Sequence, residues 1–175
     1  MLLPPFRAAD PITTTKEITM GTSTNAMLVY GYDLGSDDEW KLEGAGKYGE
    51  YDWEAHDWHN EDEGFAESAE VKLLAAHGFT ETDWQVDGFY QRQREAKAAM
   101  GVEVVTHCSG EYPMYVLAAK EIVAHRGDAK VLDLDALNRE AVEGGYDEKL
   151  RAALTALGLT PKQDRARWLL CSYWG

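Results

Sequence analysis

Short runs of apolar and aromatic residues, each bounded by polar or turn-forming residues, predict four β-strands. These runs cover residues 26–33, 102–108, 114–119 and 167–174. The second and third runs flank the turn-like segment Ser109-Gly110-Glu111, which favours a β-hairpin. Residues 122–125 are expected to continue the second hairpin strand past a β-bulge.

Apolar residues at helical spacing predict a first helix that begins after Asn60 and ends at Gly78. Asn60 is expected to be its N-cap, because three acidic residues follow and favour the positive end of a helix. Phe65, Ala69 and Leu73 would form its buried face, and Gly78 would end it in a left-handed conformation.

Three further helices follow from the same spacing. They are predicted over residues 89–100, 134–144 and 147–158. At the end of the last one, Gly158 followed by Leu159 is typical of a Schellman motif, in which Leu159 packs back on Leu154. Pro161 prevents the helix from continuing.

This order of elements predicts an α+β domain over residues 20–175, with one mixed or antiparallel sheet of about four strands and helices packed on it. Residues 1–19 show no periodicity and are expected to be a flexible arm, and residues 36–60 an irregular excursion. No run approaches the roughly 20 apolar residues of a membrane span, and no signal pattern is visible. We therefore expect a cytoplasmic protein that keeps Cys108 and Cys171 as buried thiols.

The net charge of −14 is concentrated in one part of the chain. Residues 33–87 hold 17 acidic residues and three lysines, whereas acids and bases balance on either side. A surface with this charge repels nucleic-acid phosphates and attracts basic partners or cations. The basic residues elsewhere lie among acids, so direct nucleic-acid binding is not expected.

The acidic stretch also contains tryptophan and tyrosine, which are rare in disordered acidic tails. A fixed array of carboxylates can imitate the phosphates of DNA, about one charge per 1.7 Å of duplex axis, and so occupy a basic groove. We therefore predict a non-enzymatic surface that binds a basic or nucleic-acid-binding protein. Its residues would be Asp37, Asp38, Glu39, Trp40, Glu50, Asp52, Trp53, Glu54, Asp57 and Trp58. The alternative is that the aromatic rings pack on the core and the acids keep the protein soluble.

A metal site is the second hypothesis for this stretch. In a local helix, His56 and His59 would share a face, with Asp52 one turn before and Glu63 one turn after. Imidazole and carboxylate ligands together suit a divalent transition metal such as zinc. The protein-binding hypothesis requires no cofactor.

His107 beside Cys108 does not predict a nucleophile, because neighbours on a strand point to opposite faces.

Three segments carry a resemblance to a known group of proteins. They are residues 28–35 (LVYGYDLG), 107–115 (HCSGEYPMY) and 168–175 (WLLCSYWG). In these segments the chain resembles small uncharacterised proteins of actinobacterial phages and prophages, over residues 20–175. The resemblance implies a phage-type origin and action in a bacterial cytoplasm, and it transfers no activity.

A third hypothesis is a virion or self-assembling protein with aromatic contacts near Tyr30 and Trp174.

Overall fold

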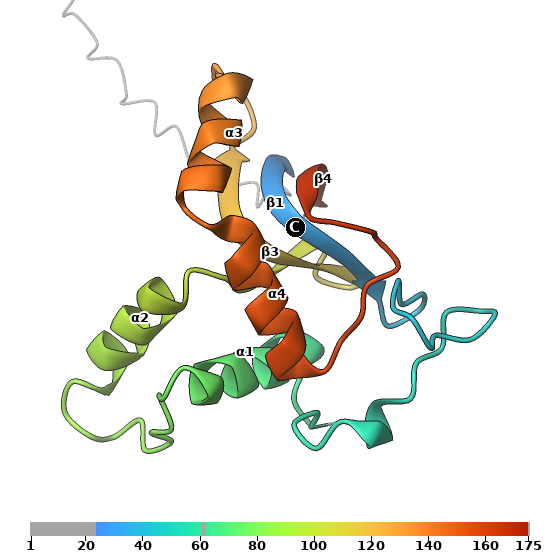
Figure 1. The fold of residues 1–175 in the computed structure, drawn as a ribbon, viewed down its shortest axis with the longest axis vertical. Helices are drawn as coiled ribbons and strands as arrows, with labels where there is room; N and C mark the ends of the chain where they lie inside the picture. Colours follow the sequence, from blue (N-terminus) through green and yellow to red (C-terminus); the bar gives the residue numbers. More distant parts are fainter. Residues whose placement is uncertain (1–23, 61, 175) are drawn as a thin grey trace, which may run out of the picture.

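A computed structural model describes residues 24–60 and 62–174, and the arm predicted for residues 1–19 lies outside them. Their fold is α+β, as predicted, with four α-helices, four strands and one short 3-10 helix in the described part (Figure 1). In chain order the elements are β1 (Thr24–Ser36), η1 (Trp53–Ala55), α1 (Phe65–Ala76), α2 (Phe89–Met100), β2 (Glu103–Ser109), β3 (Pro113–Ala124), α3 (Leu134–Glu143), α4 (Tyr146–Leu157) and β4 (Arg167–Trp174).

The four strands form one mixed sheet that closes into a small barrel in the order β1-β3-β2-β4. Strand β1 pairs antiparallel with both β3 and β4, and the predicted hairpin joins β2 to β3. A register shift after Tyr30 leaves Ala119 of β3 without a partner in β1, which is the β-bulge expected in this strand. The closing pair of β2 and β4 is parallel and joins Cys108 to Tyr173 and Ser109 to Trp174. The sequence did not indicate this closure.

Side chains of β1 alternate between two apolar layers, as the period of a strand requires. Met27 and Val29 point into the barrel, where they meet Val105 and Val116. The second layer lies between the sheet and helices α1 and α4 (Figure 1). Its fully buried residues include Leu34, Leu42, Leu73, Leu117, Leu150 and Leu157.

Helix α2 and strand β4 have the bounds that the sequence predicted, and the Schellman motif is present, with the N–H of Leu159 donating to Leu154 O. The predicted start of the first helix was wrong. Helix α1 begins at Phe65 after Gly64, because the side chain of Asn60 accepts from the N–H of Asp62 and closes a local turn instead. Helix α2 lies beside α1 and projects away from the barrel (Figure 1).

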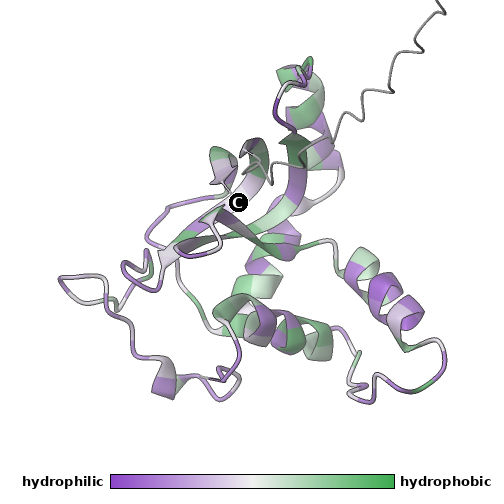
Figure 2. Cartoon of the chain, turned by 180° about the vertical axis from the view of Figure 1, so that it is seen from behind, coloured by the Kyte–Doolittle hydropathy of each residue, from purple (hydrophilic) through white to green (hydrophobic). Residues whose placement is uncertain are grey.

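Hydropathy follows this arrangement. The loop between β1 and α1 is mostly hydrophilic and α2 is largely purple, whereas much of α1 and of the strands is hydrophobic (Figure 2). Within residues 24–60 and 62–174, no helix has both the length and the apolar character needed to cross a membrane.

A glycine at the closest approach of β1 and β3 tests the barrel. A Cβ at Gly31 would overlap the carbonyl oxygen of Leu117, which is backbone and cannot move aside. We expect Gly31→Ala to lower the free energy of unfolding by about 3 kcal/mol or more, measured by urea denaturation. Gly110→Ala is the control, because nothing lies near its Cβ position, and it should change stability by less than about 1 kcal/mol. Equal unfolding midpoints would contradict the close approach.

Candidate protein-binding site

The acidic stretch forms one loop between β1 and α1, called here the acidic loop (residues 37–63, of which residue 61 is not described). The segment before β4 holds it in place. Leu42 forms an isolated β-bridge with Pro161, and the N–H of Lys162 donates to Lys41 O at 2.9 Å. The loop is therefore fixed by backbone hydrogen bonds to a segment more than a hundred residues away.

Tryptophan rings attach the loop to the core. Trp40 is only 2% exposed, stacks on Tyr115 with ring centroids 5.6 Å apart, and meets the edge of Trp53 at 4.7 Å. The indole N–H of Trp58 donates to Leu157 O at 2.9 Å. The prediction that Trp40 is a contact residue was wrong, because its ring is buried in the core. Trp53 and Trp58 are partly buried against the same core.

The carboxylates lie on the outside of the loop. Every acidic residue predicted as a contact is exposed: Asp37, Asp38, Glu39, Glu50, Asp52, Glu54 and Asp57. Within the described residues, only Asp57 of this set forms an ion pair, with Lys72 at 3.3 Å. Asp52 accepts from the N–H of Glu54 and caps η1. The loop thus presents charge that is largely uncompensated by the rest of the described chain.

Part of this surface is hollow. A cavity of about 530 Å³, called here the acidic pocket, lies between the start of the acidic loop and the start of α1. Its aromatic lining is formed by Trp40, Tyr51, Trp53 and Phe65. Its acidic lining is formed by Asp37, Glu50, Asp62 and Glu63, and His59 also lines it. The sequence showed the acids and the rings but not that they share a cavity.

Asp37 is exposed overall, but part of its carboxyl group is shielded from water in the pocket. Burial, followed by the nearby charge of Asp38, raises its pKa above the ordinary value, and His59 opposes this rise. Its carboxylate makes no hydrogen bond or ion pair within residues 24–60 and 62–174. A cation placed beside it would stabilise the ionised carboxylate and so offset the cost of partial burial and the repulsion from Asp38.

The structure does not bring the four predicted metal ligands together. Only the three residues of η1 are helical here, so the chain is extended at His56 and the shared face is lost. His56 Nε2 lies 3.1 Å from the hydroxyl of Tyr51, and His59 stacks on Trp53 with centroids 5.0 Å apart. Among the described residues, no group of three or more histidine, cysteine or acidic side chains has a geometry that could hold a metal ion.

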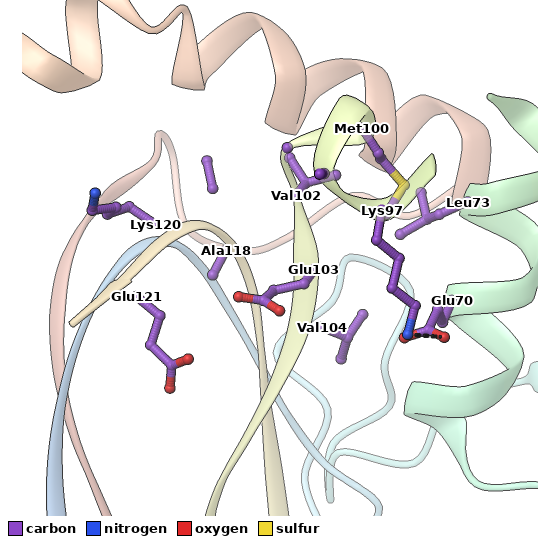
Figure 3. A pocket seen from close by; sticks show the side chains of 13 residues that line it. Glu70, Leu73, Lys97, Met100, Val102, Glu103, Val104, Ala118, Lys120 and Glu121 are labelled. Carbon is purple, nitrogen blue, oxygen red and sulfur yellow. Dashed lines mark ion pairs between the residues drawn. The ribbon is translucent and has the colours of Figure 1, made fainter. Parts of the chain in front are cut away.

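A second hollow lies between α1, α2 and the barrel and has a volume of about 420 Å³ (Figure 3). The ion pair between Lys97 and Glu70, at 2.6 Å, lies on its helical side. Glu103 of β2 and Glu121 of β3 lie on the barrel side, and burial together with Glu103 raises the pKa of Glu121. No pattern in the sequence pointed to this groove. Within the described residues, only Glu103 and Glu121 of its carboxylates form no ion pair, so it is a weaker candidate for a site than the acidic pocket.

The histidine and cysteines of the barrel do not form a catalytic pair. Burial lowers the pKa of His107, which favours the neutral imidazole, and its Nε2 is buried without a hydrogen-bond partner in the described chain. Burial also raises the pKa of the Cys171 thiol, which keeps it protonated. Both cysteines are free, and Cys108 adopts a positive φ of 73° at the end of β2. These are features of packing and of the hairpin turn.

Comparisons of the chain with protein-family models, with curated proteins and with solved structures found no match. No relative supplies a function, so the geometry of the site carries the argument.

The raised pKa of Asp37 predicts a gain in stability when its charge is removed. In the folded protein the ionised form is disfavoured, so the carboxylate lowers stability at neutral pH, and this loss disappears as the pH falls through the raised pKa. Asp37→Asn should therefore raise the Tm at pH 7, and the gain should shrink towards pH 3. Asp128→Asn removes one exposed charge from the loop after β3 and serves as the control. An equal rise in both variants would show that only net charge matters.

The positions of His56 and His59 predict that zinc does not stabilise the protein. Equimolar zinc chloride should leave the Tm unchanged to within about 1 °C, because a ligand stabilises a protein only by binding the folded state more tightly. Chelator-treated protein is the reference. A clear rise in Tm, together with one retained zinc ion per chain, would instead support the site of Asp52, His56, His59 and Glu63.

Proposed function

We propose that this protein is a phage-type accessory protein that binds a basic or nucleic-acid-binding protein through the acidic loop, without catalysing a reaction. The observation that supports this most is the arrangement of aromatic and acidic side chains in the acidic loop and its pocket. Its tryptophan rings are anchored to the core, while its described acidic residues are exposed. Of the predicted acidic contacts, only Asp57 forms an ion pair within the described chain. Packing of the rings on the core would also suit a surface that served solubility alone. The feature that favours binding is that exposed carboxylates and aromatic rings line one pocket, with no lysine or arginine of the described chain among them.

Fixed carboxylates favour binding in two ways. The loop is held by the bridge of Leu42 to Pro161 and by the hydrogen bond of Trp58, so little conformational entropy remains to be lost when a partner docks. Concentrated negative charge also increases the rate at which a positively charged partner is encountered. The effect is screened by salt, since the Debye length is about 8 Å at physiological ionic strength.

A partner that normally binds DNA would offer a surface complementary to this loop. Its lysine and arginine residues are arranged to neutralise rows of phosphates, and carboxylates presented on a rigid loop offer them the same kind of charge. Occupying that groove would prevent the partner from binding DNA. The proposed action is therefore inhibition by competition, in the bacterial cytoplasm that the phage resemblance implies.

Binding should depend on the loop charges and on salt. The variant Glu39→Gln/Glu43→Gln/Glu54→Gln, called here the loop variant, removes three exposed charges outside the acidic pocket. The partner would first be captured from bacterial lysate with the tagged protein. It should bind the loop variant roughly tenfold more weakly than the unchanged protein, mainly because association is slower. The affinity of the loop variant should also depend less steeply on salt. Asp87→Asn/Asp128→Asn/Glu143→Gln removes the same charge elsewhere and should bind normally.

DNA competition on the purified partner then tests the mimicry. A duplex that the partner binds should displace the acidic protein, and the reverse should also hold. Simultaneous binding of both, or an affinity that does not change between 50 mM and 500 mM salt, would exclude inhibition by charge mimicry.

A further inference from the structure

We propose that the acidic pocket receives the guanidinium group of an arginine side chain from the basic partner. This inference rests on the proposed function, because it names the group of the partner that the acidic loop recognises. It is carried by the combination of three properties in one cavity: aromatic side chains, several carboxylates that form no ion pair with the described residues, and a geometry unsuited to a metal ion.

The aromatic side of the pocket suits a planar cation. Trp53 and Tyr51 have ring centroids 4.7 Å apart and are both partly buried, so each keeps part of its surface accessible. His59 stacks on Trp53 with an angle of 16° between the ring planes, and His56 stacks on Tyr51, so one face of each ring is covered and a guanidinium would contact the surface that remains. Behind them the buried Trp40 and Phe65 fix the position of Trp53. Guanidinium groups stack on such faces more readily than ammonium groups do.

The acidic side of the pocket supplies acceptors from three places in the chain. Asp37 follows β1, Glu50 lies in the middle of the acidic loop, and Asp62 and Glu63 precede α1. Glu50 accepts from the N–H of Tyr48, but Asp37, Asp62 and Glu63 make no side-chain hydrogen bond or ion pair with the described residues. Among residues 24–60 and 62–174, no lysine or arginine lines the cavity.

The spacing of these carboxylates distinguishes between cations. A metal ion requires several ligands within about 2.0–2.6 Å of one point, and no three acidic or histidine side chains of the described chain are grouped in that way. A guanidinium spreads one charge over a plane and carries five N–H donors, so it can pair with carboxylates on different sides and does not need three ligands around one point. The same argument disfavours the compact, strongly hydrated ammonium of lysine.

The volume fits a side chain together with part of its backbone. At about 530 Å³ the cavity lies within the range of roughly 300–1,000 Å³ that is usual for ligand pockets. An arginine that extends from a partner's surface can therefore enter it while the flanking residues face the exposed carboxylates of the acidic loop. The pocket would provide a specific anchor, and the surrounding acids the long-range attraction.

A titration with blocked peptides tests this inference on the whole chain. Acetyl-Gly-Arg-Gly-amide, its lysine counterpart and its citrulline counterpart would be added to protein labelled with ¹⁵N-tryptophan, and the indole N–H signal of Trp53 would be followed by NMR after assignment with Trp53→Phe. We expect a saturable shift with the arginine peptide at millimolar affinity, at least threefold weaker binding of lysine, and no saturable shift with the uncharged citrulline.

Two variants locate the binding. Asp37→Asn/Glu63→Gln, called here the pocket variant, should bind the arginine peptide at least fivefold more weakly, whereas the loop variant, which keeps the pocket intact, should change its affinity less than twofold. Circular dichroism and the remaining indole signals report whether each variant is folded. If the pocket variant does not fold, Glu63→Gln alone replaces it, because that side chain is exposed.

The possible failures differ from those of the proposed function. Equal binding of the arginine and citrulline peptides, or an arginine-induced shift that the pocket variant retains, would overturn the pocket inference even if the loop variant loses its protein partner. If the protein captures no partner in a salt-dependent way, but its pocket binds the arginine peptide specifically, the proposed function is overturned and the pocket remains an arginine site.

Discussion

The packing of Trp40 is the contact on which the rest of the structure depends. This ring is 2% exposed, stacks on Tyr115 of the barrel and touches both Trp53 and Phe65. It therefore joins three parts of the molecule: the sheet, the acidic loop and the first residue of α1. Without this contact, the repulsion among neighbouring carboxylates would favour an extended and mobile loop, since like charges destabilise a compact arrangement. The apolar ring thus makes the charged surface possible.

Elements marked by local signals were predictable from sequence. Helix α2 ends at a glycine with positive φ, and β4 is a run of apolar and aromatic residues, so both could be bounded by inspection. The start of α1 was mistaken because Asn60 suits both a helix N-cap and a local turn, and the choice depends on the residues that follow. Closure of the barrel rests on pairs distant in sequence, such as Cys108 with Tyr173, which no local pattern reveals.

The candidate site was predictable in composition but not in geometry. Charge counting identified the acidic stretch, and the abundance of rings suggested an ordered surface. It did not show that Trp40 turns inward while Asp37 stays outside, because an irregular loop has no period from which facing can be read. For the same reason the histidine pair, which suggested a metal site, depended on a helical turn that the chain does not form beyond η1.

The order of the strands along the chain has a consequence for synthesis on the ribosome. β1 is the first strand and β4 the last, yet the two pair over eight residues of each, and the acidic loop is tied to the segment just before β4. Until residues 161–174 have been made, one edge of β1 has no partner and the loop lacks one of its anchors. Exposed strand edges invite association with other chains, so the growing polypeptide passes through a stage in which protection by chaperones matters most.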